Sequence, residues 1–293
     1  MTHGLSVAHL TAITLPPADL IEAAGAAGFD GVGLRLVRVT ETTPGYPLME
    51  DRAALRAALA AMRATGVAVR DIEFVKITPE TDLAALEPLL DVGAELGAGQ
   101  LITAPYDPDH ARLAAKLGAL SERARSRGID IVLEFFPWTS VPDLTTCWNV
   151  VQEAGPAVGI LADALHFDRS NSSCSLLAAL PSGRLPFAHL CDAPRLSSYD
   201  TDELLRTARE ARLPPGEGEI DLGSFLDGLH PDTDLALEVP TGRVLDREDA
   251  VDVLRSLYRT TADFLSDHRR KAVRTSENDA TEGGGLKSGR SMV

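Results

Sequence analysis

The sequence predicts an α/β protein whose eight strands close into a (β/α)8 barrel. Short apolar runs alternate with helical segments from residue 5 to about residue 265, and regular alternation of this kind indicates a parallel sheet. Eight such units match the roughly 250 residues that a closed barrel occupies. No G-x-G-x-x-G follows the first run and no G-x-x-x-x-G-K-[ST] occurs, so an open nucleotide-binding sheet is not supported.

The strands are predicted from apolar runs bounded by turn signals, which is the pattern of buried parallel strands. Most of these runs are rich in Val, Ile and Leu and carry a polar or charged residue at or near their C-terminal end. The predicted strands are 5–10, 31–36, 67–74, 100–104, 129–136, 158–163, 185–189 and 235–239.

The helices are predicted from apolar residues at helical spacing between these strands, with glycine as the usual stop signal. Gly28, Gly66, Gly97 and Gly128 end the first four segments, and Asp221 is a candidate N-cap because its carboxylate accepts from free backbone N–H groups. The predicted helices are 18–27, 51–64, 79–96, 111–127, 144–154, 175–180, 200–209, 221–229 and 247–266.

Composition excludes several classes of function. The formal net charge of −15 argues against a surface for nucleic acid or an anionic membrane, because both require a basic patch. Cys147, Cys174 and Cys191 share no C-x-x-C spacing and are odd in number, so we expect no disulfide framework and a reducing cytoplasm. Residues 1–4 do not begin a secretion signal, and no apolar run approaches the ~18 residues of a membrane span.

The chain divides into two parts by composition. Residues 1–267 carry the strand and helix pattern and are predicted to form one barrel domain. Residues 268–293 are rich in Ser, Thr, Gly, Asn and charged residues. Such a segment buries too little apolar surface to order itself, so we expect a disordered tail.

Four residues that bind metals or move protons follow the last four predicted strands: Glu134, Asp163, His189 and Glu238. Singly, each is more often a structural residue, but the carboxyl ends of the strands of a barrel converge on one mouth. Three carboxylates there would repel one another without a positive charge between them. The donor set suits one divalent metal, Mn²⁺ or Mg²⁺, with Co²⁺ or Zn²⁺ as alternatives.

Around these residues the sequence resembles a known family. It is similar to the sugar-phosphate isomerase/epimerase family of the xylose isomerase-like TIM-barrel superfamily, from about Leu5 to Leu265. The resemblance implies a TIM barrel and a small-molecule substrate, and it is compatible with a homo-oligomer. The motifs that carry it are Leu133-Glu134, Asp163–His166, His189–Arg195, Pro215–Asp221 and Leu237–Val239.

The resemblance also implies roles for single residues. The four strand-end residues would ligate the metal, with Glu134 and Glu238 also acting as the catalytic acid/base pair. His166 and Arg195 would hold oxygen atoms of the substrate. Asp192 is expected to orient the ligating histidine from behind, as such histidines usually require.

Three functions remain open on this pattern. The first is a metal-dependent isomerase or epimerase that removes a proton next to a carbonyl of a sugar-like or cyclic polyhydroxy compound. The second is a metal-dependent dehydratase, a lyase, of a cyclic keto-polyol such as an inosose or a 3-dehydroshikimate-type substrate. The third is a barrel that binds metal or ligand without catalysis.

Further substrate contacts are predicted from their positions at the same mouth. His9, Arg35 and Glu73 lie at the ends of the first three predicted strands, with a structural ion pair as the alternative for each. Trp138 lies in the loop Phe135–Ser140, which would form an apolar rim for a less polar cyclic substrate.

Overall fold

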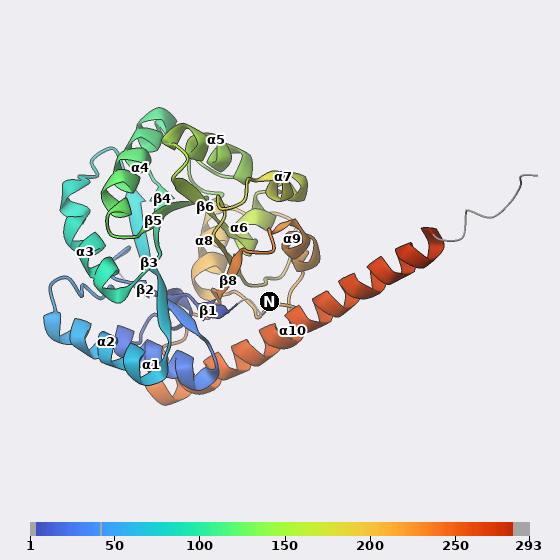
Figure 1. The fold of residues 1–293 in the computed structure, drawn as a ribbon, viewed down its shortest axis with the longest axis horizontal. Coiled ribbons are helices and arrows are strands. Elements are labelled where there is room, and N and C mark those ends of the chain that lie inside the picture. The colour runs from blue at the N-terminus through green and yellow to red at the C-terminus, as the bar shows by residue number, and fades with distance from the viewer. Residues whose placement is uncertain (1–3, 42, 284–293) are drawn as a thin grey trace, which may run out of the picture.

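The computed structural model describes residues 4–41 and 43–283 and confirms the closed barrel (Figure 1). Eight parallel strands pair in sequence order, and β8 closes the ring on β1. The strands are β1 (Leu5–Val7), β2 (Gly31–Arg35), β3 (Ala68–Ile77), β4 (Gln100–Pro105), β5 (Asp130–Glu134), β6 (Val158–Asp163), β7 (Phe187–Leu190) and β8 (Asp234–Leu237).

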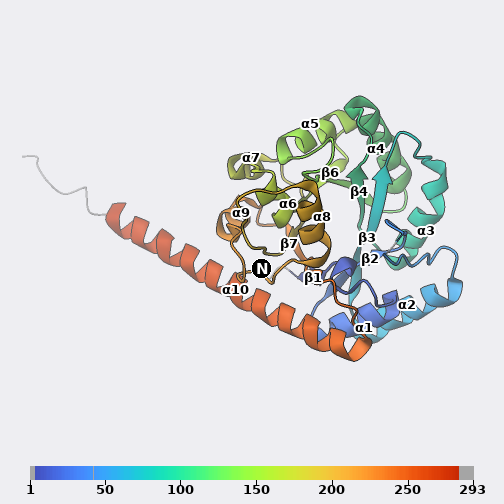
Figure 2. The same cartoon turned by 180° about the vertical axis from the view of Figure 1, so that it is seen from behind.

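The helices form the outer layer of the barrel, as Figure 1 and the reverse view in Figure 2 show. Two short 3-10 helices, η1 (His9–Ala12) and η2 (Ala84–Leu86), accompany them. The α-helices are α1 (Pro17–Ala27), α2 (Arg52–Thr65), α3 (Glu87–Leu96), α4 (His110–Arg125), α5 (Leu144–Ala154), α6 (Ala164–Arg169), α7 (Cys174–Ala179), α8 (Thr201–Glu210), α9 (Leu222–Gly228) and α10 (Arg247–Gly283).

Local sequence signals explain most helix ends. Asp221 accepts from the N–H of Ser224 and caps α9 as expected, and Gly28 ends α1 with a φ of 111° that favours glycine. The third helix starts later than expected, at residue 87 instead of 79. There Thr81 Oγ1 accepts from the N–H of Thr78 at 2.7 Å, and this side-chain bond favours a turn over a helix.

Inside the barrel, a small apolar cluster lies one layer below the strand ends. It contains Ile102, Val132, Leu161, Phe187 and Ala236. Side chains that are two residues apart on a strand point to the same face. The next inward-facing positions on the last four strands are therefore Glu134, Asp163, His189 and Glu238.

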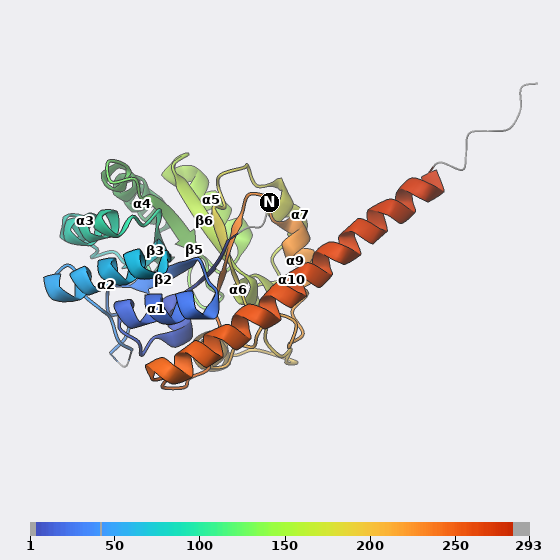
Figure 3. The same ribbon diagram turned by 60° about the horizontal axis from the view of Figure 1, so that its bottom comes forward.

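The last helix extends beyond the predicted barrel domain into the segment predicted as a tail. α10 packs on α1 and continues to Gly283, leaving the barrel as a long projecting helix (Figure 3). Disorder was expected because this segment cannot bury a core, but a helix satisfies its backbone hydrogen bonds internally. His268 also anchors it, with Nε2 lying 3.0 Å from Oδ1 of Asp227.

Some predictions fall outside or only partly within the described chain. Residues 1–3, in the segment where no secretion signal is expected, and residues 284–293 of the predicted tail lie outside the described residues. Within residues 4–41 and 43–283, none of the helices has the length and apolar character to cross a membrane.

Candidate metal centre and substrate cavity

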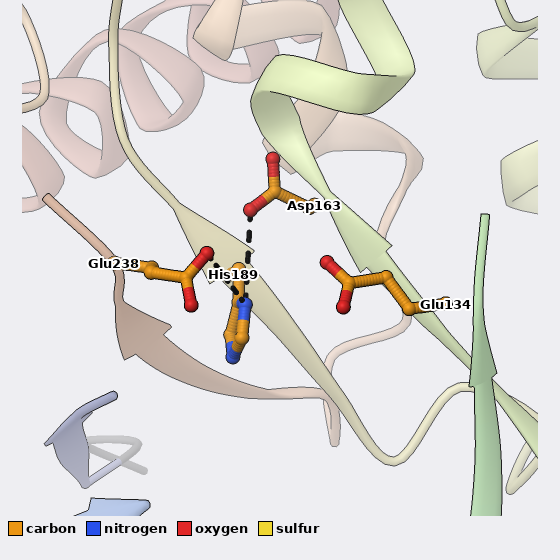
Figure 4. A group of neighbouring side chains, drawn as sticks. All are labelled: Glu134, Asp163, His189 and Glu238. Atoms are coloured by element: carbon orange, nitrogen blue, oxygen red, sulfur yellow. Dashed lines mark ion pairs between the residues drawn. The ribbon is translucent and has the colours of Figure 1, made fainter. Parts of the chain in front are cut away.

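The four predicted ligands lie together at the carboxyl ends of β5 to β8 (Figure 4). One donor atom from each of Glu134, Asp163, His189 and Glu238 lies within 4.8 Å of the others, and all four residues are at most 4% exposed. His189 Nδ1 faces the carboxylates, 3.7 Å from Asp163 Oδ2 and 3.6 Å from Glu238 Oε2. The strand ends thus converge as the sequence predicts.

The two carboxylate oxygens of Asp163 have different partners and different roles. Oδ1 accepts from the N–H groups of Leu165 and His166, which caps α6 and fixes the carboxylate at the end of β6. Oδ2 faces the cluster and accepts from Arg212 at 2.5 Å. The motif Asp163–His166 is therefore a strand end followed directly by a capped helix.

Arg212 is a site residue that the sequence reasoning did not identify. Its guanidinium is buried beside the cluster, with Nη1 on Asp163 and Nη2 2.7 Å from Glu238 Oε2. Nη1 also lies 3.3 Å from Sγ of Cys191. Arg212 follows the predicted helix 200–209 and belongs to no motif. Its isolated position just before Leu213 is the one sequence signal that could have suggested it.

The pKa values within the cluster diverge. Burial raises the pKa of Glu134 well above its usual range, against the opposing effect of His189. Burial also disfavours ionisation of Glu238, but Arg212 and His189 outweigh it and hold the pKa of Glu238 at about 2. Arg212 likewise keeps the pKa of Asp163 well below normal despite burial.

The cluster fits a divalent metal by charge and by donor type. When all three carboxylates are ionised, the guanidinium of Arg212 leaves two negative charges in a buried site, which a divalent cation would balance. Both ring nitrogens of His189 are buried and make no hydrogen bond among the described residues, which leaves Nδ1 free to ligate. The mostly oxygen donor set suits Mn²⁺ or Mg²⁺.

A cavity opens onto this cluster, and several predicted substrate residues line it. Glu134 and Glu238 lie in its wall together with His166, Arg35, Glu73 and Trp138. Aromatic rings form one side, where the ring centroid of Trp138 lies 5.2 Å from that of His166 and that of Phe136 lies 4.8 Å from it. The remaining lining residues are Leu10, Val39, Thr40, Thr43, Phe74, Tyr106, Ala208, Arg209 and Arg212.

Arg35 and Glu73 also form an ion pair, which is the structural alternative to substrate contact that was predicted for them. Arg35 Nη2 donates to Glu73 Oε2 at 3.0 Å, and both side chains are buried. The pair lines the cavity, so it is both a structural pair and part of the wall that faces a substrate.

His9 and Arg195 are not brought to the cavity. His9 is buried with both ring nitrogens occupied, Nε2 bonding the carbonyl of Leu15 and Nδ1 accepting from the N–H of Arg35. Burial lowers the pKa of His9 to about 4. The side chain of Arg195 is 59% exposed and pairs with Asp168 at 2.9 Å. The predicted substrate contacts of these two residues have no support in the structure.

Asp192 also differs from its expected role. Its carboxylate accepts from the backbone N–H groups of Ala193, Gly216 and Ile220, not from His189. These bonds anchor the motif Pro215–Asp221 to the end of β7, so Asp192 holds a loop in place.

Comparison with known proteins identifies the family to which this barrel belongs. The family model described as the xylose isomerase-like TIM barrel matches residues 21–260. The chain belongs to this family. The match confirms the resemblance that the sequence motifs indicate.

Within the family, two curated relatives carry the same name. The chain is 30% identical over 227 residues to a 3-dehydroshikimate dehydratase of Pseudomonas putida, covering 73% of this chain and 33% of that protein. It is 31% identical over 194 residues to one of Pseudomonas aeruginosa, covering 60% and 29%. The chain thus spans about a third of the length of these relatives.

Among solved structures, the barrel is similar to that of the IolI protein, which is described with a bound zinc atom. The TM-score is 0.73 at 18% sequence identity, over 89% of this chain and 99% of that chain. At this identity the likeness supports the fold.

Proposed function

We propose that this protein is a divalent-metal-dependent dehydratase of a cyclic keto-polyol carboxylate of the 3-dehydroshikimate class. The buried cluster of Glu134, Asp163, His189 and Glu238, of which the two glutamates line a cavity, carries the proposal. The same residues would serve an isomerase, an epimerase or a dehydratase, so the site alone does not choose between these reactions. The names of the two relatives support the dehydratase.

The four residues of the cluster would hold the metal, preferably Mn²⁺ or Mg²⁺. When bound, the metal polarises the substrate's ketone and neighbouring hydroxyl and so acidifies the adjacent C–H. The aromatic side of the cavity, formed by Phe136 and Trp138, suits a six-membered ring whose product is aromatic.

The chain's own residues would move the protons. Glu134 and Glu238 lie on either side of His189 (Figure 4), so two carboxylates are available on different sides of a bound ring. One accepts the proton from the carbon next to the ketone, and the other protonates the β-hydroxyl that leaves as water. Loss of one further ring proton to the ketone oxygen gives 3,4-dihydroxybenzoate, so one water leaves per substrate.

Two other groups would stabilise charge during this reaction. His166, whose pKa burial lowers to about 4, is neutral at physiological pH and can hydrogen-bond a substrate oxygen. Arg212, and not Arg195, lines the cavity beside the cluster, where it offsets negative charge.

The test is incubation of the Mn²⁺-loaded protein with 3-dehydroshikimate, an inosose and a ketohexose in D₂O, followed by mass spectrometry. The dehydratase predicts loss of water from 3-dehydroshikimate alone and growth of catechol absorbance. Deuterium incorporation without water loss would favour the isomerase or epimerase. Metal binding without either change would favour a non-catalytic barrel. The Glu134→Gln protein is the matched control.

Two predictions about the whole protein remain proposals. The thiols of Cys147, Cys174 and Cys191 are free, which supports a reducing, cytoplasmic location. A homo-oligomer is also proposed, from the resemblance alone.

A further inference from the structure

Two cationic side chains, Arg209 and Lys76, lie at or beside the wall of the substrate cavity. Arg209, at the end of α8, lines the cavity directly. Lys76, near the end of β3, donates to the carbonyl of Val39 at 2.9 Å and lies 4.9 Å from the ring centroid of Tyr106. Val39 and Tyr106 both line the cavity, so Lys76 stands at its wall.

Neither cation is paired with a carboxylate among the described side chains, in contrast to Arg35 and Arg212. Arg35 pairs with Glu73, and Arg212 pairs with two carboxylates of the cluster. Among the side chains that the structure describes, Arg209 has no hydrogen bond or ion pair, and the one hydrogen bond of Lys76 goes to a carbonyl. A protein with a net charge of −15 thus keeps two unpaired cations at this place.

The surroundings of Lys76 disfavour its charged form. Partial burial lowers the pKa of Lys76, and the nearby charge of Arg209 lowers it further. An anion bound between them would relieve both effects, since an opposite charge within a few ångströms favours the ionised form of each.

We propose that Lys76 and Arg209 form the subsite for the carboxylate of the substrate. This proposal rests on the proposed function and adds how the substrate is oriented. Arg212 and a divalent metal would already balance the three carboxylates of the cluster, whereas Lys76 and Arg209 offer unbalanced positive charge, so the substrate's carboxylate points toward this pair. The ketone and hydroxyl end then lies against the cluster, and the ring lies along Trp138.

The pair also accounts for specificity. A neutral sugar or inosose offers nothing to neutralise Lys76 and Arg209, whereas a ring carboxylate forms charge-assisted hydrogen bonds with both. The site would therefore select cyclic keto-acids over uncharged keto-polyols that the metal cluster alone could accept.

Calorimetric titration tests the subsite without turnover. The probes are 3,4-dihydroxybenzoate and its neutral analogue 3,4-dihydroxybenzamide, added to the Mn²⁺-loaded protein. We expect the benzoate to bind at least about tenfold more tightly, since a hydrogen bond to a charged group contributes roughly 1.5–3 kcal/mol and 1.4 kcal/mol is tenfold. Lys76→Met and Arg209→Gln should each weaken benzoate binding about tenfold and leave benzamide binding unchanged.

Two further variants separate the subsite from general effects. Arg206→Gln, on the same helix, removes an exposed arginine that pairs with Glu203 and does not line the cavity, so benzoate binding should be unchanged. Lys76→Arg keeps the charge and should retain most of the preference for the benzoate. Thermal unfolding of each variant shows whether it is folded.

The outcomes distinguish this inference from the proposed function. Equal binding of the two probes to the wild type, no binding of either, or equal losses for both probes in the variants overturns the subsite. If 3-dehydroshikimate is dehydrated with an unchanged KM in both variants, the subsite is wrong and the function stands. If nothing is dehydrated but the benzoate preference disappears in the variants, the subsite stands and the function is wrong.

Discussion

The guanidinium of Arg212 lies 2.7 Å from Oε2 of Glu238, and the same group donates to Oδ2 of Asp163 at 2.5 Å. Arg212 therefore links two residues of the candidate metal centre that come from different strands. It neutralises part of their charge in a site where all three side chains are buried.

Replacement of Arg212 by Met should destabilise the metal-free protein strongly. Removing one partner of a buried ion pair leaves uncompensated charge, which typically costs about 3–5 kcal/mol. Mn²⁺ should restore part of that loss because it supplies positive charge to the same carboxylates. Chemical denaturation with and without Mn²⁺ measures both effects.

Arg195→Met is the matched control for Arg212. Arg195 is exposed and pairs with Asp168 at the surface, where solvent screens the pair, so its loss should leave stability nearly unchanged. Dehydratase activity should fall far more in the Arg212 variant than in the Arg195 variant. Equal effects of the two substitutions on activity would contradict the placement of Arg212 at the reacting end of the substrate.

Metal content tests the cluster itself. Glu134→Gln and His189→Ala each remove a proposed ligand, so the purified variants should hold much less Mn²⁺ than the wild type by elemental analysis. Glu217→Gln, which changes an exposed carboxylate in the loop before α9, should bind metal like the wild type. Unchanged metal content in both ligand variants would contradict the assignment of Glu134 and His189 as ligands.

His9 should make stability sensitive to acid. Burial lowers its pKa from 6.5 to about 4 in the folded protein, so the unfolded chain binds a proton first as the pH falls. The stabilising contribution of neutral His9 to the free energy of unfolding is complete above about pH 6.5. It is lost toward about pH 4, a change of about 3 kcal/mol. The unfolding free energy of the wild type and of His9→Gln should therefore converge over this range.

Both proteins are kept in chelator for this comparison, so that competition between protons and metal does not enter. A difference in unfolding free energy that stays constant between about pH 6.5 and about pH 4 would show that His9 is not held neutral by the fold.

Asp71 should have the opposite effect on the pH dependence. It lies in the barrel opposite Gly33, where an added Cβ would meet Oδ1 at 2.5 Å, and neither of its carboxylate oxygens has a hydrogen-bond partner among the described residues. Burial, and secondarily Glu73, raises its pKa from 3.8 to about 7. The folded state therefore loses stability as the pH rises from about 4 to about 7, by about 4 kcal/mol in total.

Asp71→Asn cannot ionise, so it should be more stable than the wild type at about pH 8 and lose that advantage toward about pH 4. Denaturation profiles at the two pH values measure this. A variant that is less stable at about pH 8 would mean that the Asp71 carboxylate has a stabilising partner when ionised.

The sequence alone predicts the barrel and the metal cluster for one physical reason. The alternation of strands and helices is local, and parallel strands place their carboxyl ends on the same side of the barrel. Glu134, Asp163, His189 and Glu238 each end a strand, so their meeting follows once the strands are counted correctly.

The same reasoning does not locate side chains once the chain leaves the strand, and His9 and Arg195 do not line the cavity. His9 follows β1, but η1 begins at once and turns the ring onto backbone groups of Leu15 and Arg35. Arg195 follows the β7 motif, yet its loop lies at the surface and its guanidinium pairs with Asp168.

The composition and periodicity of this chain therefore determined its fold, its apolar core and its four candidate ligands. Only the tertiary structure decided which arginine reaches the cluster, that Asp192 holds a loop, and that Arg209 lines the cavity. Those contacts join side chains from loops and helices far apart in the chain, and their positions depend on packing instead of on a repeating local pattern.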